Sequence, residues 1–123
     1  MRVSREEFEA LVEEALALLP EEFRAALDNV AVMVEEEPSD EDLDGVGIDP
    51  DDPDRDELFG LYQGVPLPDR DSMYSALPDR VLVYRGPILR ACATRREVIR
   101  EVRETVQHEL GHYFGMEEDE LPF

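Results

Sequence analysis

The stretch Gln107-His108-Glu109-Leu110-Gly111-His112-Tyr113-Phe114-Gly115 lies near the end of the chain and contains both of its histidines. The histidines are four residues apart, and a glutamate directly follows the first. On a helix, residues i and i+4 lie one turn apart on the same face, so both imidazoles can reach a single metal ion. The spacing therefore predicts a metal site on a helix, with the upstream chain as its scaffold.

The residues before this stretch predict that helix. Thr94 is a suitable N-cap, and Glu97 three residues later completes a capping box. One stripe along the helix is apolar, and another is polar and includes both histidines. The apolar stripe consists of Val98, Ile99, Val102, Val106, Leu110, Tyr113 and Phe114. Gly115 can adopt the left-handed conformation and end the helix.

The rest of the chain predicts an α+β domain. Ser4 can cap a first helix, whose apolar positions recur every three to four residues from Phe8 to Leu19, and Pro20 ends it. Further elements are expected in this order: a helical turn at 21–27, strands at 29–37, 58–65 and 80–85, and a short turn at 88–91 opened by Pro87. We therefore expect one domain over residues 1–123, with a small mixed or antiparallel sheet, an N-terminal helix and a C-terminal helix that carries the histidines.

An acidic segment from Ser39 to Glu57 reads as a solvated loop. Its Asp40-x-Asp42-x-Asp44-Gly45 pattern matches the first half of a calcium-binding loop. Its twelfth position is Asp51, where such a loop needs a bidentate glutamate, and prolines replace the expected flanking helices. A solvated loop is the favoured interpretation, and a calcium-responsive binding module is the alternative.

Composition restricts the partners. The formal net charge is -20 over 123 residues, which disfavours nucleic acid or an anionic membrane as the main partner. No apolar run approaches the roughly 18 residues of a membrane span, and the N-terminus lacks the apolar region of a signal peptide. Cys92 is the only cysteine, so we expect a buried structural thiol and no intramolecular disulfide. A cytoplasmic protein is expected.

An H-E-x-x-H helix is the zinc-binding motif of metallopeptidases, with the glutamate as general base. His108 and His112 are thus predicted ligands of one zinc ion per chain, and Glu109 is the predicted base. A catalytic zinc site normally has a third protein ligand, and a turn at Gly115 would bring the acidic run 117–120 near the metal. Glu118 is favoured because it completes H-E-x-x-H-x-x-G-x-x-E, and Asp119 is the alternative.

Two functions fit this site. The first is hydrolysis of a peptide or protein substrate by a zinc-activated water, with Glu109 accepting the proton. The second is a zinc-binding regulatory or interaction protein without peptidase activity.

Three segments together resemble the bacterial minimal zincin-like metallopeptidases. They are Gly60-Leu61-Tyr62-Gln63-Gly64-Val65-Pro66-Leu67, Val81-Leu82-Val83-Tyr84-Arg85-Gly86-Pro87-Ile88, and the residues from His108 to Gly115. The resemblance implies a zincin fold, with an active-site helix beneath a small sheet whose edge strand can pair with an extended peptide. By the family pattern the ligands would be His108, His112 and an acidic residue at position 118. An aspartate is more familiar there, so Glu118 is a departure.

Overall fold

The computed structural model describes residues 1–64 and 79–116. The helices are α1 (Arg5–Ala17), α2 (Glu21–Ala26), α3 (Asp40–Gly45), α4 (Arg85–Ala91) and α5 (Arg95–Tyr113), with a 3-10 helix η1 (Pro53–Glu57). The strands are β1 (Val30–Glu35), β2 (Gly60–Gln63) and β3 (Asp79–Tyr84). None of the described helices is both long and apolar enough to cross a membrane.

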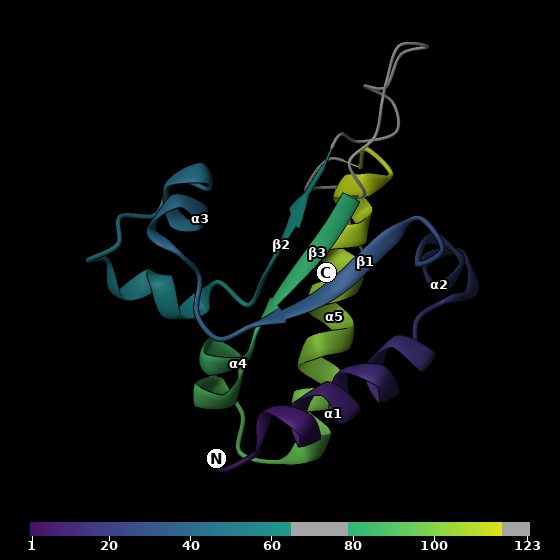
Figure 1. The fold of residues 1–123 in the computed structure, drawn as a ribbon, viewed down its shortest axis with the longest axis horizontal. Helices are drawn as coiled ribbons and strands as arrows, with labels where there is room; N and C mark the ends of the chain where they lie inside the picture. Colours follow the sequence, from purple (N-terminus) through teal and green to yellow (C-terminus); the bar gives the residue numbers. More distant parts are fainter. Residues whose placement is uncertain (65–78, 117–123) are drawn as a thin grey trace.

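The sheet has the order β1-β3-β2, with β1 parallel and β2 antiparallel to the central strand β3 (Figure 1). A strand that is covered on both faces of the sheet reads as a continuous apolar run. In β3, the residues from Val81 to Tyr84 are all buried. β2 therefore lies at one edge of the described sheet.

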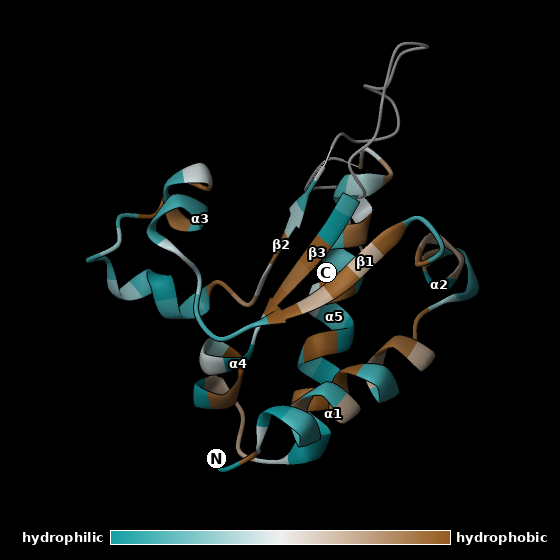
Figure 2. Cartoon of the chain, viewed as in Figure 1, coloured by the Kyte–Doolittle hydropathy of each residue, from teal (hydrophilic) through white to brown (hydrophobic). Residues whose placement is uncertain are grey.

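The core lies between the sheet and two helices, α1 and α5, with α5 running behind the strands in Figure 1. The apolar stripe of α5 is buried as predicted, because Val98, Val102, Val106 and Leu110 have no exposed surface. From α1 the core receives Phe8 and Ala15, both fully buried. Figure 2 shows the same division, with brown segments on β1 and β3 and mostly teal ones along α3. The core thereby fixes α5 against the sheet.

The predicted helix caps form. The Ser4 hydroxyl accepts a hydrogen bond from the backbone N–H of Glu7 at 3.1 Å. The Thr94 hydroxyl accepts one from the N–H of Glu97, whose carboxylate accepts in turn from the N–H of Ala93. In a capping box the Glu97 carboxylate would accept from the N–H of the N-cap residue, Thr94. Here it accepts from the N–H of the preceding residue, Ala93. α4 begins at Arg85, earlier than the predicted turn at 88–91, because the chain enters the helix directly from β3.

The interpretation of residues 39–57 as a loop was wrong, since this segment contains α3 and η1. Ser39 caps α3 in a capping box with Asp42, and acidic residues in the first turn favour the helix dipole. Leu43 is fully buried and attaches the helix to the molecule. Because Asp40, Asp42 and Asp44 all lie on this helix, they do not form the calcium-binding loop considered above.

The observed fold is therefore the α+β class with a small mixed sheet, a helix at the N-terminal end and the histidine-bearing helix at the C-terminal end. The predicted short strand at 58–65 is observed as Gly60–Gln63. Its last predicted residue, Val65, lies outside the described residues.

Candidate metal centre

The last two turns of α5 bring His108, Glu109 and His112 together. One ligand atom from each side chain lies within 4.8 Å of the other two. The two imidazole rings are 5.2 Å apart between centroids and nearly perpendicular, with an interplanar angle of 75°. All three side chains are partly exposed, so they are held by the helix and still reachable from solvent. This is the arrangement that the i, i+4 spacing predicted.

The Glu109 carboxylate points toward the sheet. Its Oε1 accepts a hydrogen bond from the backbone N–H of Tyr62 on β2 at 2.9 Å. Its Oε2 lies 4.0 Å from Nε2 of His108. The two oxygens of one carboxylate therefore face the edge strand and the histidine pair.

Gly60 allows β2 to lie this close to α5. A Cβ atom at position 60 would be 2.6 Å from Cγ2 of Thr105 and 2.8 Å from the carbonyl oxygen of Leu82. Both distances are far below van der Waals contact, and the second neighbour is rigid backbone. Only a glycine fits between this helix and strand in the observed arrangement.

The helix ends directly after the second histidine. Gly115 has a φ of 79°, and its N–H donates to the carbonyl of His112 at 3.0 Å. The N–H of Met116 donates to the carbonyl of Gly111 at 2.9 Å. These two bonds form a Schellman motif, and the predicted left-handed glycine is confirmed.

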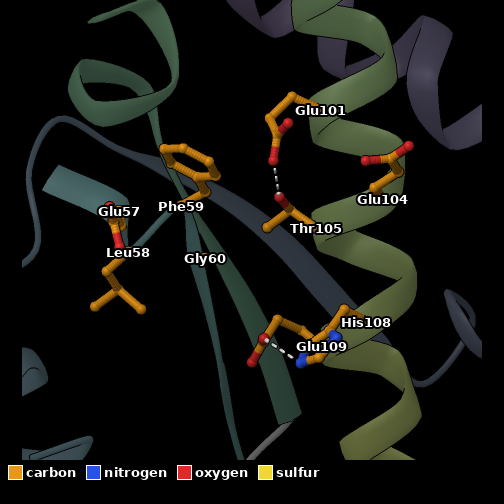
Figure 3. A pocket seen from close by; sticks show the side chains of 9 residues that line it. All are labelled: Glu57, Leu58, Phe59, Gly60, Glu101, Glu104, Thr105, His108 and Glu109. Atoms are coloured by element: carbon orange, nitrogen blue, oxygen red, sulfur yellow. Dashed lines mark hydrogen bonds and ion pairs between the residues drawn. The ribbon is translucent and has the colours of Figure 1, made fainter. Parts of the chain in front are cut away.

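A groove passes the histidine pair, formed by two adjoining cavities that share Leu58, Gly60, His108 and Glu109. The first cavity, of about 290 Å³, lies between η1, the start of β2 and α5 (Figure 3). Its lining includes three further acidic residues, Glu57, Glu101 and Glu104, beside Leu58 and Phe59. The second, of about 450 Å³, continues past His112. It is lined on its other side by Val46, Leu58 and Leu61. The groove is thus acidic on one side of the site and more apolar on the other.

Burial changes the ionisation of some nearby groups. Desolvation, with a smaller contribution from Glu104, raises the pKa of the Glu101 carboxyl above its ordinary value. Desolvation also raises the pKa of the Cys92 thiol, which is buried as predicted and therefore little reactive. For the Tyr84 hydroxyl, desolvation and the hydrogen bond to Asp42 both raise the pKa. Tyr84 consequently remains a hydrogen-bond donor.

Of the residues predicted for the site, His108, Glu109 and His112 lie together. Glu118 and its alternative Asp119 lie outside the described residues, so the third ligand stays a prediction. The sequence reasoning missed the backbone N–H of Tyr62 and the cavity wall at Val46. The glycines of the β2 segment are the one available signal, since a glycine inside a strand often marks a close approach of another part of the backbone.

The chemistry of this donor set fits zinc. Two imidazole nitrogens and carboxylate oxygens are the ligands that zinc accepts in catalytic sites. The histidines come from one rigid helix whose end is fixed by the Schellman motif, so their spacing is set before any ion binds.

The comparisons with known proteins agree with this geometry. The sequence model of the family described as zincin-like metallopeptidase matches residues 27–122, which include the three strands and α5. Among solved structures, the chain is similar to a conserved hypothetical protein from Thermus thermophilus, at 26% sequence identity and a TM-score of 0.55. That similarity covers 91% of this chain and 94% of the other. Among curated proteins, no sequence matches significantly.

Proposed function

Because the chain belongs to the zincin-like metallopeptidase family, we propose that it is a zinc-dependent metallopeptidase that hydrolyses a peptide or protein substrate. The observation that carries this proposal is the convergence of His108, Glu109 and His112 within 4.8 Å on the wall of a groove. The proposal includes one zinc ion per chain, a single domain over residues 1–123 and a cytoplasmic location.

In this proposal each residue has a distinct role. His108 and His112 hold the ion, and Glu118 supplies the third ligand. Zinc, when bound, lowers the pKa of a coordinated water to near neutrality and polarises a carbonyl group. Glu109 accepts the proton of the attacking water and passes it to the leaving amine. Its hydrogen bond to Tyr62 keeps one carboxylate oxygen on the strand side and leaves the other facing His108.

The edge strand supplies a place for the substrate backbone. In the described part of the sheet no strand pairs with the outer side of β2, which lies along the groove. An extended peptide can add to such an edge as a further strand, with backbone hydrogen bonds for affinity and pockets for selectivity. This placement would bring a scissile bond past the histidine pair.

Metal analysis and a cleavage assay test the proposal together. We expect about one zinc per chain in the wild type and in Glu109→Ala, and loss of zinc in His108→Ala and His112→Ala. Cleavage of a mixed peptide library should fall by at least about 10²-fold in Glu109→Ala, because a general base contributes about that factor or more. Glu14→Gln, which changes an exposed carboxylate on α1, is the matched control and should cleave as the wild type does.

The outcomes separate the two functions considered from the sequence. Equal cleavage by zinc-loaded wild type and Glu109→Ala would reject peptidase activity and leave a zinc-binding regulatory or interaction protein. Absence of zinc binding by the wild type would reject both the peptidase and the zinc-binding regulatory protein.

A further inference from the structure

The cavity of about 450 Å³ beside the histidine pair has two unlike sides. One side carries His108, Glu109 and His112, and the opposite side carries Val46, Leu58 and Leu61. Its volume lies within the roughly 300 to 1,000 Å³ typical of ligand pockets, which combine apolar walls with a few polar groups. The apolar side is available for contact with a ligand.

Val46 reaches this cavity from α3, which is firmly built. Its N-terminus has the capping box of Ser39 and Asp42. Its C-terminus has a Schellman motif, in which Ile48 N–H donates to the Leu43 carbonyl at 2.8 Å and Gly47 N–H to the Asp44 carbonyl at 3.0 Å. Gly47 has the required left-handed backbone, with a φ of 79°. Val46 is the C-cap residue of this closed unit.

Side-chain hydrogen bonds also fix α3 to the sheet. Asp42 accepts a hydrogen bond from the hydroxyl of buried Tyr84 at 2.9 Å and another from the side-chain amide of Gln63 at 3.2 Å. Gln63 belongs to β2, so α3 and the edge strand are held to each other. The fully buried Leu43 adds an apolar contact next to these polar ones. The position of Val46 over the groove is therefore determined by the fold.

Despite this fixed position, Val46 is 42% exposed, and of the exposed large apolar residues in the described part of the chain it is the one that lines this cavity. Folding gains little from an apolar side chain left in water, whereas covering it on binding is favourable. The net charge of -20 disfavours the approach of acidic substrate side chains. The other cavity is also lined by Leu58 and Phe59, but its lining includes three further acidic residues, Glu57, Glu101 and Glu104, which the cavity of about 450 Å³ lacks. These acidic residues make it the less suitable of the two for an apolar group.

We infer that the cavity of about 450 Å³, here called the Val46 cavity, is a specificity subsite. It takes an apolar side chain of the substrate peptide next to the scissile bond. Val46 and Leu61 are its specificity-determining residues. This inference rests on the proposed peptidase function and names the class of its substrate. Because the wall comes from the α3 segment, selectivity is set by a part of the chain separate from the zinc helix.

Binding to an inactive variant tests the inference without relying on turnover. The probes are short, fluorescently labelled Gly-Ser peptides that differ at one central position, which is Leu, Phe, Ser or Asp. Zinc-loaded Glu109→Ala should bind the Leu and Phe peptides about 10-fold more tightly than the Ser peptide, as expected for a side chain in an apolar pocket. In the double variant Glu109→Ala/Val46→Asp, the preference for the Leu and Phe peptides should be lost. In Glu109→Ala/Val46→Ala it should be reduced.

Met33→Asp is the matched control, because Met33 is 41% exposed on β1 and lines neither cavity of the groove. It should leave the preference unchanged, and circular dichroism should show each variant folded. Equal binding of all four peptides, or a preference that survives Val46→Asp, would overturn the inference. Cleavage of the library by the wild type without apolar selectivity would also overturn it while sustaining the peptidase function. Val46-dependent apolar binding without any cleavage would sustain this subsite as a peptide-binding site and reject only hydrolysis.

Discussion

The Oε1 oxygen of Glu109 accepts a hydrogen bond from the backbone N–H of Tyr62 at 2.9 Å, across 47 positions of sequence. This bond joins the zinc-motif helix to the edge strand of the sheet. Tyr84 N–H donates to the Phe59 carbonyl at 2.9 Å, which places Phe59 in a hydrogen-bonded pair with β3. The backbone N–H and C=O groups of successive residues point alternately to the two sides of a strand. Those of Leu61 therefore point toward β3, whereas those of Gly60 and Tyr62 point away from it. The carboxylate of Glu109 therefore occupies a donor on the outer side of β2.

This relationship predicts a change in hydrogen exchange. In Glu109→Ala the Tyr62 amide loses its charged acceptor, and its exchange should be at least about 10-fold faster, because a hydrogen bond to a charged group contributes about 1.5–3 kcal/mol. Amide exchange followed by NMR measures this directly. Glu109→Gln keeps an oxygen at the same place and should retain most of the protection. The Leu61 amide is the internal control, and equal acceleration at Leu61 would indicate general loosening of β2 instead.

A second prediction concerns the closeness of β2 and α5. Gly60→Ala places a methyl group 2.6 Å from Thr105 and 2.8 Å from the Leu82 carbonyl, so the strand must move away from the helix. We expect a loss of about 1–3 kcal/mol in the free energy of unfolding, as for other overpacked sites. The Tyr62 amide should also exchange faster, because its distance to Glu109 increases. Urea unfolding and hydrogen exchange give the two readouts.

Gly45→Ala is the control for that substitution. A Cβ at position 45 has no neighbour within 4 Å and the backbone is not left-handed, so alanine should be neutral or stabilising by up to about 1 kcal/mol. Adding Thr105→Ala to Gly60→Ala removes one of the two clashes and should restore part of the stability. No recovery in the double variant would mean that the Leu82 carbonyl alone sets the limit.

The features that could be predicted from the sequence are those encoded locally. α5 was predictable because its cap, its apolar stripe and its H-E-x-x-H turn all lie within one segment, and β3 because it is one apolar run. The bond between Glu109 and Tyr62 was not predictable, since it depends on how β2 lies against α5. Gly60 signalled a close approach without identifying the partner.

The α3 segment shows how composition misled the interpretation. Its aspartates suggested a solvated loop, yet Ser39 and Asp42 form a capping box and the single buried Leu43 attaches the helix. The S-x-x-D spacing was present in the sequence, but the acidic background hid it. The outward position of Val46 depends on the hydrogen bonds of Asp42 to Tyr84 and Gln63, which link three distant segments. The position of Val46 in the cavity could therefore not be predicted from the sequence.

A third prediction concerns the end of the zinc-motif helix. Gly115→Ala forces an alanine into a φ of 79°, which should cost about 1–2 kcal/mol in stability. Because the N–H of Gly115 is bonded to the carbonyl of His112, the change should also weaken zinc binding, measured by competition with a chelator. Gly47→Ala is the matched control, since it has the same φ in the equivalent motif of α3 and should lower stability without lowering zinc affinity. Equal zinc affinity in the two variants would contradict the prediction.

The fourth prediction uses the raised pKa of Glu101. Burial, followed by repulsion from Glu104, makes the folded protein hold this proton more tightly than the unfolded chain does. The contribution of Glu101 to stability is therefore fully present below the ordinary glutamate pKa near 4.5 and is lost as the pH rises through the higher folded pKa. Arg100 and the hydrogen bond from Thr105 act in the opposite direction and limit the shift.

It follows that Glu101→Gln should be more stable than the wild type at about pH 7, and that this advantage should disappear at about pH 4. Thermal unfolding of the metal-free proteins at both pH values measures the difference. Glu14→Gln removes the same unit of charge from an exposed site on α1, so it reports the general effect of lowering the net charge of -20. The midpoint of Glu101→Gln should exceed that of Glu14→Gln near neutral pH and match it in acid. If the two variants shift together at both pH values, the stabilisation comes from net charge alone, and the half-buried position of Glu101 beside the groove does not raise its pKa enough to affect stability.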